Sequence, residues 1–138
     1  MEKMPETPRA LGEAIGMTYQ EMLAELATLV DGNPEPSAVS TGVADLKGRT
    51  VQKMIAWGRL RDVLTPANRQ VVDAATLSTL QRTDKAHWQA FTDATNHYRT
   101  LDNGLANTIA SLNIVTQYAA FELLKEQSPD EAKRLGIE

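Results

Sequence analysis

The sequence predicts an all-α protein, an antiparallel bundle of four or five helices that forms a single domain over residues 1–138. Apolar residues recur at helical spacing along most of the chain, and no stretch shows the alternation of a strand. Three Ser/Thr-Pro pairs place a capping hydroxyl directly before a proline, which is typical of a helix start. The hydrophobic fraction of 42% and the charged fraction of 23% are ordinary for a globular domain.

The first helix is expected over residues 8–30, after a short tail over residues 1–7 and with Thr7 as its cap. Gly12 and Gly16 flank its apolar stripe and would allow another helix to approach closely. The stripe contains no charge and consists of Leu11, Ile15, Tyr19, Met22, Leu23, Leu26, Leu29 and Val30.

Residues 31–40 are expected to form a loop, because Gly32 and two prolines interrupt the helical pattern there. The second helix then covers residues 42–64, and the third, over residues 66–82, begins at a Thr-Pro pair. The apolar face of the second helix consists of Val43, Leu46, Thr50, Met54, Trp57 and Leu64. The third helix is weakly amphipathic and carries Val71, Val72, Ala75 and Leu80.

The fourth helix starts at Thr83 or Asp84, and residues 103–121 follow it as a run of nineteen residues without a formal charge. Residues 84–127 form either one continuous helix or a hairpin closed at residues 102–104, and usual helix lengths favour the hairpin. A short capped helix is expected over residues 129–135. The fourth helix carries Trp88, Phe91, Ala94, Tyr98 and Leu101 on one side. The stripe of the following helix is Leu105, Ile109, Leu112, Thr116, Ala119 and Leu123.

The opposite side of this fifth helix lacks the charges that a surface helix normally carries. Asn107, Ile114, Tyr118 and Phe121 lie on that side, and they predict an interface. A twofold homodimer that pairs this face with its own copy is favoured over a monomer, and another protein is the alternative partner.

The composition narrows the class of function. The chain has no cysteine and a net charge of −4, so it lacks disulfides, thiol nucleophiles and the basic stripe that nucleic-acid binding requires. No apolar run is long enough for a membrane span, and no zinc or other metal motif is present. We therefore expect a soluble cytoplasmic protein, or a periplasmic one if a leader has been removed, without cofactor, metal, nucleic acid or membrane partner.

Three polar side chains on apolar stripes are candidates for a ligand site between helices: His87, Tyr98 and Arg61. The more ordinary interpretations are a histidine at the edge of the core and an arginine that pairs within the domain. Glu21 and Glu25 lie one turn apart but off the apolar stripe, which favours a solvated face over an acid–base pair.

With no catalytic motif present, the leading hypothesis is a non-enzymatic protein–protein interaction domain: an adaptor, an immunity-type inhibitor or an assembly factor. The alternative is a small-molecule-binding bundle, or an enzyme of unrecognised type, with a pocket between its helices.

Overall fold

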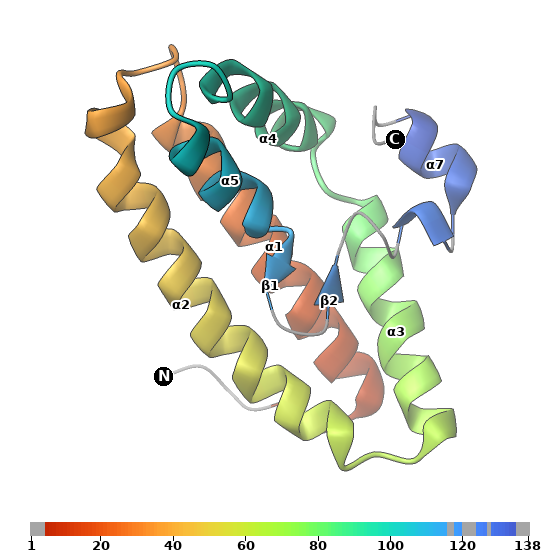
Figure 1. The fold of residues 1–138 in the computed structure, drawn as a ribbon. Coiled ribbons are helices and arrows are strands. Elements are labelled where there is room, and N and C mark those ends of the chain that lie inside the picture. Colours follow the sequence, from red (N-terminus) through yellow and green to blue (C-terminus); the bar gives the residue numbers. More distant parts are fainter. Residues whose placement is uncertain (1–4, 116–117, 120–123, 127, 135–138) are drawn as a thin grey trace.

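The computed structural model describes residues 5–115, 118–119, 124–126 and 128–134, and it has the predicted all-α bundle architecture (Figure 1). Within these residues, two strands of two residues each also form a small antiparallel pair. The elements are, in chain order, α1 (Pro8–Leu29), α2 (Pro36–Asp62), α3 (Pro66–Gln81), α4 (Lys85–Tyr98), α5 (Asn103–Ser111), β1 (Ile114–Val115), β2 (Tyr118–Ala119) and α7 (Pro129–Arg134).

Helix α1 is the centre of the bundle, because it packs against α2, α3 and α4. In Figure 1 it lies between α2 and α3, while α5 and the β1–β2 pair cover one of its sides. Helix α2 runs antiparallel to α1, whereas α3 runs parallel to it. The molecule therefore has one layer of α2, α1 and α3, and a second, smaller layer of α4, α5 and the two strands.

The helix starts predicted from Thr-Pro pairs are confirmed. The Thr7 hydroxyl accepts a hydrogen bond from the backbone N–H of Ala10 at 3.0 Å, and Thr65 caps Asn68 in the same way at 3.2 Å. In each case the proline after the cap occupies the first turn, where its missing N–H costs nothing. Helix α7 also begins at the predicted residue, Pro129.

The predicted loop over residues 31–40 is too long, because α2 begins at Pro36 rather than at residue 42. Gly32 and Asn33 make the turn with positive φ angles of 75° and 53°, and this turn needs no further residues. Pro36 then fixes a helical φ at the first position of α2. The additional turn places Val39 in the core, where 3% of its surface is exposed.

The hairpin alternative for residues 84–127 is confirmed, since α4 ends at Tyr98 and α5 starts at Asn103. Asp102 caps the new helix by accepting a hydrogen bond from the Leu105 N–H at 3.1 Å. Leu105 and Ile109 of the predicted stripe are buried, as expected.

The prediction of a helical stripe that runs on to Leu123 is wrong, because α5 ends at Ser111 and the chain enters β1. The physical reason is local: Ile114 and Val115 are β-branched, and such residues favour strands over helices. The two strands pair with Ile114 opposite Ala119 and Val115 opposite Tyr118. Of the remaining stripe, Leu112 is buried and Thr116 and Leu123 lie outside the described residues.

The most extensive helix contact in the bundle joins α1 to α3. A Cβ atom added at Gly12 would lie 2.3 Å from the carbonyl oxygen of Val72, and one at Gly16 would lie 2.5 Å from Cβ of Thr79. The Thr76 hydroxyl donates to the carbonyl of Gly12 at 3.1 Å. The close approach predicted at the two glycines is confirmed, and its partner is α3.

Two residues predicted on apolar stripes are instead exposed. Val71 is 44% exposed because α3 turns Val72, Thr76 and Thr79 toward α1, and Leu101 is 59% exposed because it lies beyond the end of α4. The largest fully buried side chains include Trp88, Tyr19, Tyr98, Ile15, Met22, Met54 and Ile109. No helix in the described part of the chain is long and apolar enough to cross a membrane.

Candidate functional site

One side of α1 is left uncovered by the other elements that the structure describes. Tyr19 points toward the second layer, where its hydroxyl donates to the carbonyl of Asn113 at 3.5 Å, and its side chain is fully buried. Met17 lies about 200° around the helix from Tyr19, on the opposite side, and is 51% exposed. We call the surface around Met17, where α1 lies between α2 and α3, the open face.

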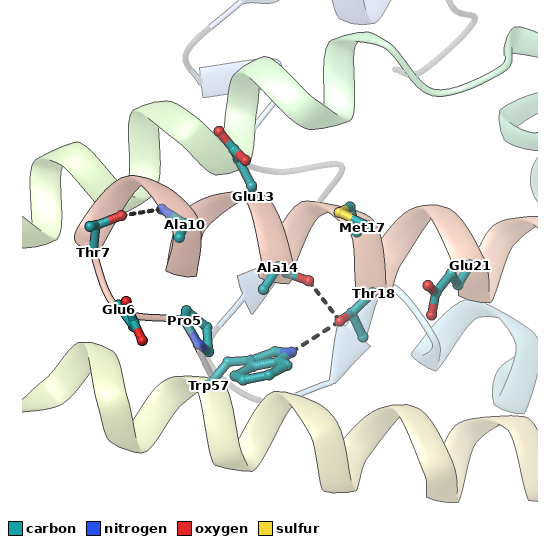
Figure 2. A pocket seen from close by; sticks show the side chains of 10 residues that line it. All are labelled: Pro5, Glu6, Thr7, Ala10, Glu13, Ala14, Met17, Thr18, Glu21 and Trp57. Atoms are coloured by element: carbon teal, nitrogen blue, oxygen red, sulfur yellow. Dashed lines mark hydrogen bonds between the residues drawn. The ribbon is translucent and has the colours of Figure 1, made fainter. Parts of the chain in front are cut away.

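A groove of about 450 Å³ lies on the open face between α1 and α2 (Figure 2). The segment that leads into α1, from Pro5 to Thr7, closes one end of the groove. Besides Pro5, its apolar lining comes from Ala10, Ala14 and Met17 of α1 and from Trp57 of α2. The alanines are short, so the groove follows the side of α1 on which they lie.

Hydrogen bonds within the protein hold the wall of this groove in place. The Trp57 indole N–H donates to the Thr18 hydroxyl at 3.0 Å, and that hydroxyl donates to the carbonyl of Ala14 at 2.8 Å. The side chain of Trp57 is 6% exposed, and Thr18 is likewise buried. These bonds fix the indole ring between α1 and α2, which makes the groove a formed feature of the bundle (Figure 2).

Three carboxylates stand among the described residues that line the groove. Glu6 lies at its N-terminal end, and Glu13 and Glu21 lie on α1. Glu13 pairs with Arg9 at 3.1 Å and Glu21 pairs with Lys53 at 3.4 Å, but these side chains are all more than 40% exposed. Such exposed pairs add little to stability, so the acidic groups remain available to a ligand.

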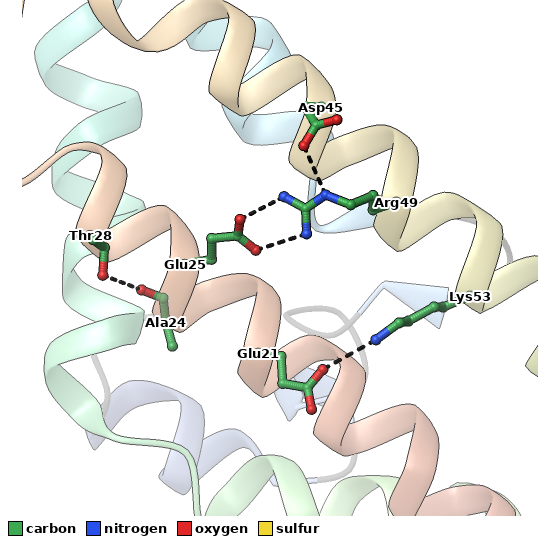
Figure 3. A network of polar contacts seen from close by, with 7 residues as sticks. All are labelled: Glu21, Ala24, Glu25, Thr28, Asp45, Arg49 and Lys53. Carbon is green, nitrogen blue, oxygen red and sulfur yellow. Dashed lines mark hydrogen bonds and ion pairs between the residues drawn. The ribbon is translucent and has the colours of Figure 1, made fainter. Parts of the chain in front are cut away.

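A network of charges continues along α1 and α2 beyond the groove (Figure 3). Arg49 of α2 bonds both carboxylate oxygens of Glu25, at 2.6 and 3.1 Å, and Asp45 at 2.8 Å. The hydrogen bonds to Glu25 and then to Asp45 raise the pKa of Arg49. Glu21 and Glu25 thus lie on a solvated face, as their positions predicted, and they link α1 to α2.

A second, smaller hollow of about 370 Å³ lies on the other side of α1, against α3. It is lined by Arg9 and Glu13 of α1 and by residues that include Val71 and Ala75 of α3. Met17 and Val71, two exposed large apolar residues, therefore both belong to the open face.

The three predicted ligand-site residues are not brought together. Arg61 bonds Asp73 of α3 through two nitrogens, at 2.8 and 3.0 Å, near the connection between α2 and α3. The Tyr98 hydroxyl donates to the carbonyl of Pro34 at 2.5 Å, near the connection between α1 and α2 at the other end of the bundle (Figure 1). His87 is half-buried beside the α3–α4 connection and lines a hollow of its own.

The Tyr98 side chain is fully buried, and its surroundings make the phenol less acidic. Burial of the phenol, followed by the negative charge of Glu35, raises the pKa of Tyr98. Its hydrogen bond closes α4 onto the α1–α2 connection, which is a structural role.

The predicted interface residues lie largely outside the part of the chain that can be assessed. Asn107 is exposed on α5, as an interface residue would be in the single chain. The side chains of Ile114 and Tyr118 and the whole of Phe121 lie outside the described residues. The homodimer expected from this face therefore stays a prediction.

The groove was missed by sequence reasoning, although α1 carried a signal for it. Ala10 and Met17 lie on the side of α1 away from Tyr19, where a surface helix normally carries charged residues, and Ala14 lies beside them at the edge of the core. Small and apolar residues in such positions indicate a covered or partner-binding side.

Among residues 5–115 and the shorter described stretches that follow, no group of three or more His, Cys, Asp or Glu side chains is placed to hold a metal ion. Comparisons of the chain with protein-family models, curated protein sequences and solved structures found no match. The geometry of the open face is thus the basis for assigning a function.

Proposed function

We propose that this protein is a non-enzymatic helical interaction domain that binds a protein partner on its open face. The observation that carries the proposal is a central helix with one side in the core and the other side exposed along a formed groove. Met17 and Val71 give this face apolar contact area, and charged residues surround them. An apolar centre with a polar rim is the usual arrangement of a protein interface.

Site-specific photo-crosslinking tests this proposal. A benzophenone amino acid is placed at Met17 or Val71. The controls are Val63 and Leu101, which are 81% and 59% exposed and lie in the α2–α3 and α4–α5 connections. After irradiation in cells of the organism that makes the protein, we expect a discrete adduct from the first two positions and none from the controls. Adducts of equal yield at all four positions, or none at any, would contradict the proposal.

A small-molecule-binding function is the second candidate, because the groove volume of about 450 Å³ lies within the range of ligand pockets. A thermal-shift screen of metabolites separates the two functions. A ligand at 100 times its dissociation constant stabilises its protein by about 2.7 kcal/mol, which raises the melting temperature measurably.

Sedimentation equilibrium on the same preparation tests the predicted homodimer.

A further inference from the structure

The polar side chains of the groove between α1 and α2 that can still bind a ligand are negatively charged. The Thr7 hydroxyl accepts from the Ala10 N–H, and the Thr18 hydroxyl already bonds both Trp57 and Ala14. None of the described residues that line the groove is Lys, Arg or His, and the ionisable groups among them are three carboxylates. A ligand that fits this groove must therefore bring positive charge and hydrogen-bond donors.

The carboxylates are accessible to such a ligand. Among the residues that the structure describes, Glu6 has no ion-pair partner. Glu13 and Glu21 are paired, but their side chains are 44% and 60% exposed, and water competes strongly for exposed pairs. A partner's cation can share or replace the present ones.

The spacing of the groove residues indicates the shape of the ligand. Glu13 and Glu21 are separated by eight residues of α1, which is roughly 12 Å along the helix axis. Met17 lies midway between them, and methionine adapts its side chain to a variety of apolar partners. A second helix laid along α1 would reach both carboxylates with side chains that are themselves about two turns apart.

We infer that the partner's docking segment is a helix with two basic residues about two turns apart and a large apolar residue between them. The basic residues pair with Glu13 and Glu21, and the apolar side chain enters the groove beside Met17 and over Trp57. This inference rests on the proposed function and specifies the partner that the open face takes. Helix-in-groove recognition is a common mode of peptide binding.

Charge also argues against a second copy of the chain in this groove. A twofold contact places the same patch of both copies face to face, so Glu13 and Glu21 would meet the same acidic residues of the other copy. Like charges that face each other across an interface weaken binding, so a second copy is disfavoured in this groove. The groove therefore fits a basic helix of another protein.

A labelled alanine-rich helical peptide tests the inference, with lysine at its fourth and twelfth positions and leucine at its eighth. We expect fluorescence anisotropy to show saturable binding to the wild-type protein and at least tenfold weaker binding to the variant Glu6→Gln/Glu13→Gln/Glu21→Gln. Peptides with glutamate in place of lysine, or serine in place of leucine, should bind at least tenfold more weakly to the wild type.

The matched control removes the same charge elsewhere, in the variant Asp31→Asn/Asp62→Asn/Glu126→Gln, whose three side chains are exposed. We expect its affinity for the lysine peptide to stay within twofold of the wild type. Equal losses of affinity in both variants would overturn the inference, because binding would then reflect net charge alone. NMR shifts that avoid Met17 and Trp57 would overturn it as well, because the peptide would then bind outside the groove. If the lysine peptide showed no detectable binding, the inference would also be overturned. Crosslinks from Met17 in the same protein would then still support the proposed interaction function, with a partner of different chemistry.

Discussion

Replacing Gly12 by alanine adds one methyl group at the tightest point of the α1–α3 contact. That methyl carbon would lie 2.3 Å from the carbonyl oxygen of Val72 and 2.6 Å from Cβ of Ala75. Non-bonded carbon atoms prefer separations of about 3.5–4.0 Å, so α1 and α3 must move apart by roughly 1 Å. The conflicting oxygen belongs to the backbone of α3 and cannot rotate away as a side chain could.

Two contributions of opposite sign determine the expected stability change. Overpacking costs about 1–3 kcal/mol, and the backbone conflict places Gly12→Ala near the upper value. Alanine recovers about 1 kcal/mol through its higher helix propensity. The net loss is about 2 kcal/mol, which for 138 residues lowers the melting temperature by about 7 °C.

The assay is thermal and urea unfolding followed by circular dichroism, with Gly48→Ala as the matched control. Gly48 is also inside a helix, but no atom lies within 4 Å of an added Cβ there. The control should therefore gain up to about 1 kcal/mol from helix propensity alone. If Gly12→Ala melted at or above the wild-type temperature, as Gly48→Ala is expected to, the close packing of α1 on α3 would be refuted.

Two further predictions concern polar contacts. In a double-mutant cycle measured by urea unfolding, we expect a coupling free energy of about 1 kcal/mol between Arg61→Ala and Asp73→Ala. The two side chains share two hydrogen bonds and are only 21% and 34% exposed. A coupling of zero would mean that the pair does not stabilise the fold. Because the pKa of Tyr98 is raised, its contribution to stability should be constant below about pH 10 and lost as the pH rises through the folded-state pKa. Tyr98→Phe should flatten this alkaline loss, and an unchanged slope of stability against pH would contradict the assignment.

Helix starts were predictable wherever the cap and the proline are adjacent in sequence, as at Thr7 and Thr65. The start of α2 was not, because its cap position is Glu35, which makes no side-chain capping bond. The end of α5 was missed for a different reason. Hydrophobic periodicity extended the helix past Ser111, whereas the β-branched residues Ile114 and Val115 favour the strand that forms there.

The candidate site was less accessible to sequence reasoning than the fold. Periodicity identifies the side of a helix that is buried, but it does not say which neighbours cover the rest. His87, Tyr98 and Arg61 were selected because each interrupts an apolar stripe, yet their convergence depends on the packing of separate helices. The structure instead gives Arg61 and Tyr98 partners within the bundle, at opposite ends of it.

The open face follows from how α1 divides its surface among its neighbours. Gly12 and Gly16 bring α3 against one flank, and the Thr18–Trp57 bond holds α2 against the other. The second layer covers the side that carries Tyr19. These three contacts leave the side of Met17 exposed, so the glycine contact that stabilises the bundle and the groove that would bind a partner lie on different sides of one helix. Substitutions at Gly12 or Gly16 can therefore change stability without replacing a residue that lines the groove.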